Sequence, residues 1–261
     1  MIQQLLQLFS IQLLGHMLGD FYLQCERMCD SKRRNGFKSC ALYVHTLLVF
    51  LSAWGVTATL SFWWAALLIA ILHGLVDGVK SYIPKSGVLK KTLNSSISFY
   101  IDQVIHVSVI AFVVWLYVNH YGWQEWNWLT PYRNSMILAV VFCLWPANFF
   151  IGEFLRMIKI EKNNKEKKGS QEDIGEEHRK QTLDASRVIG SVERMLVFVF
   201  VWLGQYSAIG FLITAKSVMR FPEMGQGKNN AEYYLVGSLL SFGVSIMLVA
   251  TIIALHSKGV L

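Results

Sequence analysis

Charged residues are scarce in this chain of 261 residues: Lys, Arg, Asp and Glu together make up 16% of it. Soluble globular domains carry about 25% charged residues. Here 54% of the residues are hydrophobic and the mean hydropathy is +0.40. Apolar stretches of roughly 20 residues recur, each long enough to cross a ~30 Å hydrocarbon core as a helix. The composition therefore predicts an all-α, polytopic transmembrane helix bundle rather than a soluble domain.

Cysteine is also rare, with four residues in the whole chain. The CxxxC pair of Cys25 and Cys29 differs from the CxxC spacing of most zinc sites, so reduced, unpaired thiols are the simpler interpretation. A cleavable signal peptide is not expected. The N-terminus MIQQ has no positive region, and the apolar run behind it contains His16 and Asp20. We expect this run to be retained as the first span.

The net charge of +7 comes mainly from Lys and Arg in the segments between apolar stretches. The positive-inside rule explains such segments, so no nucleic-acid partner is expected. Membrane lipids are the predicted partners, and the sequence leaves a homo-oligomer open. The basic segments follow the first, third and fifth apolar stretches. This pattern predicts a multi-pass protein of the bacterial inner membrane, with the N-terminus outside and the C-terminus in the cytoplasm.

About seven spans are predicted, and they divide the chain into four regions. The sixth span is long and contains Gly204 and Gly210, so it is either kinked or split into two pieces. The spans are 3–23, 40–60, 62–82, 98–119, 136–158, 188–215 and 231–256. The regions are a four-helix His/Asp-bearing membrane domain (1–120), an interfacial segment with the fifth span (121–160), a charged cytoplasmic linker (161–186) and a C-terminal helical membrane region (187–261).

Three His/Asp pairs share one spacing within the first four spans. Partners four positions apart leave the same face of a helix, one turn from each other. In each pair the predicted topology puts Asp nearer the cytoplasm and His one turn deeper, and His45 lies at the same depth. The pairs are His16 with Asp20 in HMLGD, His73 with Asp77 in HGLVD, and Asp102 with His106 in DQVIH.

Acidic side chains at membrane depth are costly, about 2.5–3.5 kcal/mol each at the centre of a helix. A divalent cation would neutralise the three carboxylates and accept neutral imidazoles. The sequence therefore predicts a site for one or two ions of Zn, Mn or Fe, with Asp20, Asp77 and Asp102 as catalytic candidates as well. A purely structural polar network and an ion-translocation pathway remain as alternatives.

A second polar group is predicted near the same membrane face, where spans five and six meet the cytoplasm. Glu and Arg side chains there either neutralise each other or bind a phosphate group, which suits the geometry of Arg. The candidate substrate- or phosphate-binding residues are Arg187, Arg194 and Lys80.

The motifs HMLGDFYLQ, HTLL, HGLVDGVK and DQVIH resemble a bacterial membrane-protein family known only as domain-of-unknown-function family 3307. The resemblance covers roughly the first 120 residues, and the remainder is similar to a C-terminal extension found in some members. That family implies no activity. A looser similarity links the chain to membrane-bound metal-dependent hydrolases, which also carry HxxxD-like motifs on membrane helices, although their His-rich N-terminal signature is missing here.

The function predicted from these observations is metal-dependent hydrolysis within the membrane. A lipid or a phosphoester-type substrate would reach the site from the cytoplasmic side, where the His/Asp layer is predicted to open. The alternatives are an ion-coupled transporter and a non-catalytic membrane partner or scaffold protein.

Overall fold

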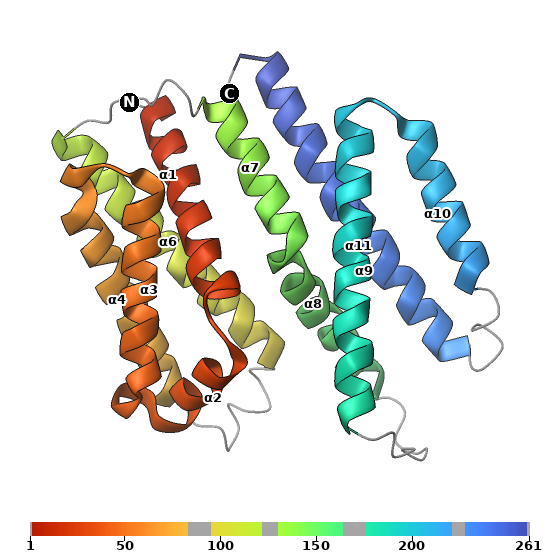
Figure 1. The fold of residues 1–261 in the computed structure, drawn as a ribbon, viewed down its shortest axis with the longest axis horizontal. Coiled ribbons are helices and arrows are strands. Elements are labelled where there is room, and N and C mark those ends of the chain that lie inside the picture. The colour runs from red at the N-terminus through yellow and green to blue at the C-terminus, as the bar shows by residue number, and fades with distance from the viewer. Residues whose placement is uncertain (1, 83–94, 122–129, 164–175, 221–227, 260–261) are drawn as a thin grey trace. The chain divides into compact units, whose positions relative to one another are not determined.

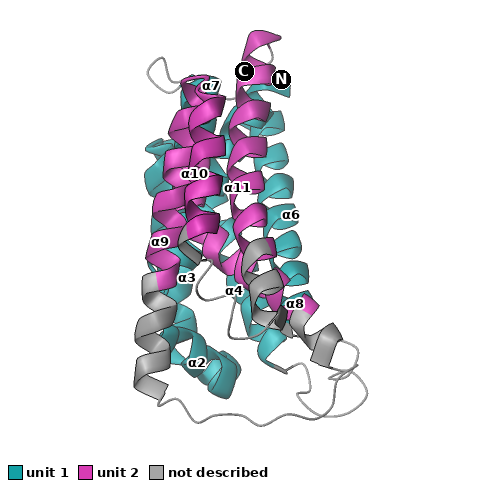
Figure 2. Cartoon of the chain, turned by 90° about the vertical axis from the view of Figure 1, so that its right-hand side faces the viewer, with its two compact units in different colours: residues 1–138 teal, residues 139–261 magenta. Residues whose placement is uncertain are grey.

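The computed structural model describes residues 2–82, 95–121, 130–163, 176–220 and 228–259. Every regular element in these ranges is a helix, which confirms the predicted all-α class. The chain separates into two compact units, residues 1–138 and residues 139–261 (Figure 2).

Unit 1 contains the three His/Asp pairs. Its elements are α1 (Ile2–Met17), the π-helical turn η1 (Leu18–Tyr22), α2 (Glu26–Asn35), the short 3₁₀ turns η2 (Gly36–Lys38) and η3 (Leu60–Phe62), α3 (Cys40–Thr57), α4 (Trp63–Tyr82) and α6 (Ser95–Tyr121). α3 contacts both α1 and α4, and α6 contacts the same two helices (Figure 1). Apolar side chains such as Leu8, Ile11, Val49 and Val113 form the core between them.

The short helix α2 was not expected, because the sequence predicts a basic loop at this position. It has no buried residue and carries Lys32, Arg33 and Arg34 in its last turn, where cations interact favourably with the helix dipole. α2 contacts α3 and α4. A basic helix, rather than a free loop, therefore lies next to the helices that carry the His/Asp pairs.

Unit 2 consists of the remaining helices. They are the end of α7 (Pro131–Leu144), α8 (Pro146–Asn163), α9 (Glu176–Trp202), α10 (Tyr206–Arg220) and α11 (Lys228–Ser257). α7 and α8 meet at an angle of 53°, where Pro146 occupies the first position of the new helix, as proline often does. α11 packs mainly on α9 and also contacts α8.

The predicted sixth span, 188–215, is two helices rather than one. α9 ends at Trp202, and Gly204 takes a left-handed backbone conformation with φ +69°, which glycine adopts without steric cost. The chain turns back there, so α10 runs beside α9 (Figure 1). Of the two possibilities left open by the sequence, the structure shows the split.

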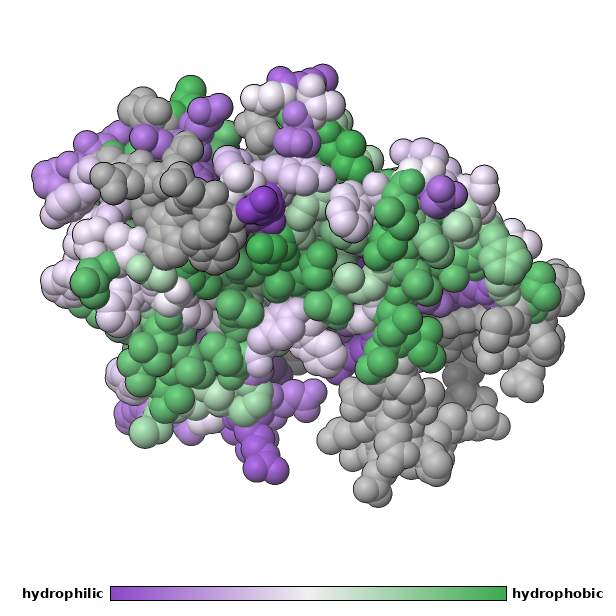
Figure 3. Space-filling model, turned by 45° about the horizontal axis from the view of Figure 1, so that its top comes forward, coloured by the Kyte–Doolittle hydropathy of each residue, from purple (hydrophilic) through white to green (hydrophobic). Residues whose placement is uncertain are grey.

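Four helical stretches in the described residues are long and apolar enough to cross a membrane, and the bent pair α7–α8 makes a fifth if it is one span. The four are Cys40–Thr57, Leu60–Ser81, Ser96–Tyr121 and Val236–Ser257. Large apolar side chains such as Leu47 and Leu51 on α3 are exposed, and hydrophobic side chains cover broad areas of the face in Figure 3. Such surfaces suit a lipid environment.

Two predicted segments lie partly outside the described residues. The Trp- and Tyr-rich segment before α7 includes 122–129, and the charged linker includes 164–175, neither of which the structure describes. The last part of that predicted linker is helical, because α9 already begins at Glu176.

Candidate metal centre

All seven His and Asp side chains singled out by their spacing come together in unit 1. Every imidazole among them is buried, with exposed fractions from 0% for His45 to 7% for His16. The helices supply them in turn: His16 from α1, Asp20 from η1, His45 from α3, His73 and Asp77 from α4, and Asp102 and His106 from α6. The seven residues that the sequence predicts at one membrane depth thus form one connected cluster in the structure.

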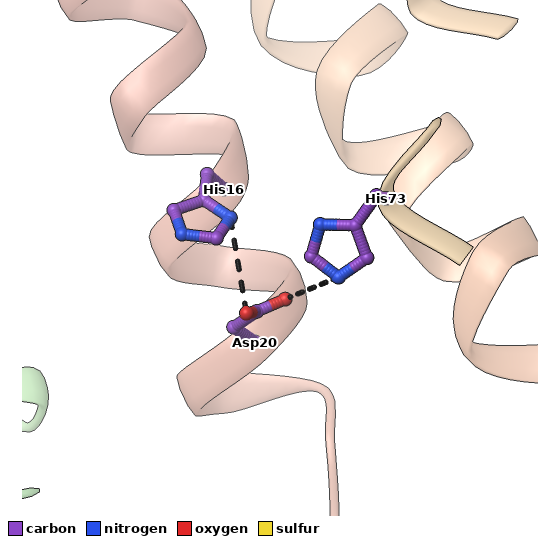
Figure 4. A group of neighbouring side chains, drawn as sticks. All are labelled: His16, Asp20 and His73. Atoms are coloured by element: carbon purple, nitrogen blue, oxygen red, sulfur yellow. Dashed lines mark ion pairs between the residues drawn. The ribbon is translucent and has the colours of Figure 1, made fainter. Parts of the chain in front are cut away.

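Three ligand atoms at the centre of this cluster form a nearly equilateral triangle. The Nε2 atoms of His45 and His73 lie 3.1 Å apart. Asp20 Oδ1 lies 3.4 Å from the first and 3.2 Å from the second, and Figure 4 shows its carboxylate directed at His73 across the gap between α1 and α4. Tetrahedral Zn²⁺ with bonds of about 2.0–2.1 Å keeps its ligand atoms about 3.3 Å apart. The triangle has the size of one face of such a site.

Five side-chain atoms of the cluster are buried without a hydrogen bond in the described residues: His16 Nδ1, Asp20 Oδ1, His45 Nδ1 and both ring nitrogens of His106. Neither Asp20 Oδ1 nor His106 Nε2 has a hydrogen-bond partner in the described residues, although two imidazole nitrogens lie close to Asp20 Oδ1. Buried polar atoms are rarely left this way, because the loss of hydration is not compensated. Atoms that converge on a common point instead of on each other fit a bound cation, so the residues present suit a metal ion.

Asp77 connects the triangle to a second group of ligands. Its Oδ2 lies 3.6 Å from His45 Nε2, and its Oδ1 lies 3.5 Å from His106 Nε2. His106 Nε2 is also 3.5 Å from Asp102 Oδ1. Asp77, Asp102 and His106 thus form a further set of ligand atoms within 4.8 Å of one another. A carboxylate between two such positions is the arrangement that two-metal sites use.

His16 stands at the edge of the cluster. Its Nδ1 is 3.8 Å from Asp20 Oδ2, while its Nε2 lies 3.3 Å from Oε1 of Gln103. Because the amide oxygen is an acceptor, Nε2 carries the proton and Nδ1 keeps its lone pair. Sequence reasoning missed Gln103. Its position three residues before His106 put it on the same face of α6 and was the available signal.

Two lysines form ion pairs with two of the three carboxylates. Lys32 Nζ of α2 lies 2.5 Å from Asp77 Oδ2, and Lys80 Nζ lies 2.7 Å from Asp102 Oδ2. Lys80 was predicted as a substrate- or phosphate-binding residue, and the structure places it beside the cluster. Lys32 was expected only as a loop charge, because nothing in the sequence shows that α2 folds over α4.

Comparison with known proteins identifies the region that builds this cluster. A family model described as "Protein of unknown function (DUF3307)" matches residues 8–133. This N-terminal region belongs to the DUF3307 family. The match covers all seven His and Asp residues of the cluster and both lysines. No curated protein and no solved structure matches the chain significantly.

Glycines next to the ligands let the helices of the DUF3307 region approach closely. A Cβ added at Gly15 of α1 or at Gly19 of η1 would lie 3.0–3.3 Å from side chains of α3. On α4, a Cβ at Gly74 would lie 2.5 Å from Thr46 Oγ1, and one at Gly78 would lie 2.1 Å from the ring of Phe37. Each of these glycines is the direct sequence neighbour of a candidate ligand. Close helix packing and ligand placement therefore depend on the same short motifs.

The turn that carries Asp20 is π-helical, running from Leu18 to Tyr22. The backbone N–H of Leu23 donates to the carbonyl of Leu18, 2.9 Å away. A π-turn adds one residue to the helical turn, and such turns are frequent at functional sites. Here the wider turn sets the position of the Asp20 carboxylate relative to His16, which the HxxxD spacing alone does not specify.

The predicted arginines lie outside the DUF3307 region, in unit 2. Arg194 is 2% exposed and donates to the carbonyl of Cys143, to Oδ1 of Asn148 and to the hydroxyls of Ser191 and Ser241. In the described residues, no carboxylate forms an ion pair with it. Arg187 lies with its guanidinium carbon 5.7 Å from the centre of the Phe149 ring.

The other charges predicted beside these arginines are paired. Arg156 Nη1 lies 2.6 Å from Glu153 Oε1 on α8, and Lys216 of α10 contacts Glu193 of α9. These pairs match the interpretation in which the charges of this region neutralise each other, except that Glu193 uses Lys216 and not an arginine.

The thiols of Cys25, just before α2, and Cys29, within it, belong to no metal-type group in the described residues. Cys25 is exposed, and Cys29 accepts a hydrogen bond from Gln24 Nε2 at 3.0 Å. Burial raises the pKa of the Cys29 thiol above its ordinary value, which disfavours the thiolate form.

Proposed function

We propose that this chain is a membrane-embedded, metal-dependent hydrolase whose first metal position is the triangle of His45, His73 and Asp20. The observation that carries the proposal is the triangle itself, with edges of 3.1, 3.2 and 3.4 Å between buried ligand atoms. Asp77 Oδ2, on the same side as His45, is the candidate fourth ligand. A structural polar network does not require three ligand atoms at this spacing.

A divalent ion bound here would supply a Lewis acid and lower the pKa of a water molecule towards ~7. The chain's own residues then supply proton transfer and positioning. Asp102 and His106 lie 3.5 Å apart beside the triangle, within reach of a water between them and Asp77, so Asp102 is the candidate general base. Gln103 holds His16 in one tautomer, as partners of metal-site imidazoles generally do.

The substrate is proposed to enter from the cytoplasmic side of a bacterial inner membrane. The basic helix α2, with Lys32 and its neighbouring arginines, lies at the end of the bundle next to the cluster. Under the positive-inside rule this end faces the cytoplasm. A site at this depth would meet lipid headgroups of the inner leaflet and soluble phosphoesters. An outer N-terminus forms part of this proposal. The predicted seven spans and cytoplasmic C-terminus counted 188–215 as one crossing, and the reversal between α9 and α10 adds one change of direction to that count.

One observation favours ion-coupled transport as a second candidate. The buried side chains of Gln7 and Gln12 continue a line of polar groups along α1 beyond His16, and Gln12 donates to the carbonyl of Ala53 at 3.1 Å. Polar residues inside a membrane helix often mark ion pathways. The surrounding core of Leu8, Ile11 and Val113 is apolar, so we rank hydrolysis first.

Metal analysis of the purified protein tests the proposal. The wild-type chain should retain at least one transition-metal ion per molecule after dialysis, measured by inductively coupled plasma mass spectrometry. His73→Ala should lose it. His120→Ala is the matched control, because His120 is exposed at the far end of α6. A metal-free wild type, or equal metal in both variants, contradicts the proposal.

A second measurement separates hydrolysis from transport. The metal-loaded protein should release phosphate from a generic phosphoester, and Asp102→Asn should abolish the release without removing the metal from the triangle. If the metal-loaded protein releases no phosphate but moves protons or cations in proteoliposomes, transport replaces hydrolysis.

A further inference from the structure

Lys32 and Lys80 each form an ion pair with one carboxylate oxygen of the cluster. Lys32 reaches Asp77 Oδ2 from α2, and Lys80 reaches Asp102 Oδ2 from the last turn of α4. Both contacts are short enough to be charge-assisted hydrogen bonds. The Lys32 side chain is 12% exposed and the Lys80 side chain 39%. The Lys80 side chain therefore reaches the surface, whereas the Lys32 side chain is about as buried as that of Asp77, which is 11% exposed.

The charge balance of the cluster changes sign when metal binds. Three carboxylates and two ammonium groups leave one net negative charge while the four imidazoles are neutral. One divalent ion turns this into one net positive charge, and two ions into three. A buried excess of charge is costly unless a counter-ion compensates it. Metal loading thus creates a demand for an anion at the same place.

We propose that Lys32 and Lys80 form a phosphate-binding site that becomes available when metal occupies the cluster. This inference rests on the metal centre proposed above. Asp77 and Asp102 turn from the lysines to the metal, and the two ammonium groups then face the anion. Lysine binds phosphate as a point charge, and it needs no fixed fork geometry for this. The substrate class that results is a phosphate monoester or diester.

The position of the two lysines indicates that the bound phosphate group would lie near the membrane surface. Lys32 belongs to a helix with no buried residue, and Lys80 lies near the end of the predicted span at Ser81. Lysines at this level reach the headgroup region. The phosphate therefore belongs either to a lipid headgroup or to a soluble molecule that approaches the cytoplasmic surface, and the two sources share one chemistry.

Equilibrium dialysis with radiolabelled inorganic phosphate tests this site in maltoside micelles, which contain no phosphate of their own. The Mn²⁺-loaded wild type should bind phosphate, and the metal-free protein should not. Lys32→Met and Lys80→Met should each weaken binding about tenfold or more, the loss expected for one charge-assisted hydrogen bond. Metal content should stay unchanged or rise, because each substitution releases a carboxylate. Lys38→Met, an exposed lysine near α2, is the control.

Two further arms make the outcomes separable. Lys32→Arg should retain phosphate binding, which a variant that merely misfolds would not do. Phosphatidylglycerol added to the micelles should displace the labelled phosphate if the natural ligand is a lipid headgroup, and should leave it bound if the ligand is soluble. Metal bound with phosphate binding independent of both lysines overturns this inference and leaves the metal centre standing. A wild type without metal overturns both.

Discussion

The Nε2 atoms of His45 and His73 face each other across 3.1 Å in the interior of unit 1. Two neutral imidazoles can share this contact only if one donates and the other accepts, yet Asp20 Oδ1 lies within 3.4 Å of both. A cation between the three atoms satisfies all of them at once. The pair joins α3 to α4, so a metal here would also link two helices of the bundle.

Cobalt substitution should report the geometry of this position. We expect Co²⁺ bound to the wild-type chain to give the intense visible absorption of a tetrahedral site, because the triangle matches one tetrahedral face. His45→Gln should lose this spectrum. His16→Gln should keep it, since His16 lies outside the triangle and contacts Asp20 through the other oxygen. A weak, octahedral-type spectrum in the wild type would contradict the assigned geometry.

Removing the amide that orients His16 should affect chemistry more than metal content. Gln103→Leu leaves His16 Nε2 without its acceptor, and outer partners of this kind typically change affinity or activity by about 10–100-fold. We expect phosphoester hydrolysis by the metal-loaded protein to fall within that range, with the Co²⁺ spectrum retained. Ser108→Ala on the same helix, where the exposed hydroxyl donates to the carbonyl of Val104 one turn earlier, should change neither. Equal activity in both variants would rule out a positioning role.

The sequence allowed much of the cluster to be predicted, because spacing within one helix is local information. His73 and Asp77 must leave α4 on one face, and the alternation of spans puts them level with Asp102 and His106. The contribution of Lys32 was not predictable in this way. It depends on how a polar segment folds back over α4, and no periodicity records that. The same holds for the π-turn at Asp20, which changes the direction of a side chain without changing its residue type.

The break between α9 and α10 marks another limit of prediction from sequence. Hydropathy continues through Trp202 and Tyr206, so a single long span and a helical hairpin look alike in an apolar run. Gly204 was the available signal, yet glycine also occurs inside membrane helices where neighbours pack closely. Tertiary contacts of α9 with α10 and α11 decide between the two, and these contacts are not local in sequence.

The packing of Gly78 against Phe37 should be sensitive to a single methyl group. Gly78→Ala would bring a Cβ to 2.1 Å from Phe37 Cε1, and overpacking of this kind costs about 1–3 kcal/mol. We expect a lower Tm in detergent and a displaced η2 segment. Gly55→Ala is the control, because a Cβ there meets nothing within 4 Å and alanine is the better helix former.

The double variant Gly78→Ala with Phe37→Ala tests the cause of that loss. If the clash with Phe37 is responsible, Gly78→Ala should lower the Tm less in the Phe37→Ala protein than in the wild type. If the Tm losses of the two single variants simply add in the double variant, the effect of Gly78→Ala does not come from the contact with Phe37.

Arg194 should prove to be a structural residue of unit 2 and not a phosphate ligand. Its guanidinium already donates to a carbonyl and three side chains on α7, α8, α9 and α11. Arg194→Met leaves several buried acceptors unsatisfied, each at about 1–3 kcal/mol, so we expect a large drop in Tm or loss of folded protein. Arg194→Lys should recover only part of this stability, because lysine lacks the planar set of donors.

The matched control for Arg194 is Arg156→Met, whose side chain is 64% exposed and paired only with Glu153 in the described residues. An exposed pair contributes roughly 0–1 kcal/mol, so its Tm should stay near the wild-type value. Metal content and phosphate binding in the folded fraction of Arg194→Lys should equal the wild type, because the hydrogen-bond partners of Arg194 in the described residues all lie in unit 2. A selective loss of phosphate binding with Tm unchanged would return Arg194 to the role predicted from the sequence.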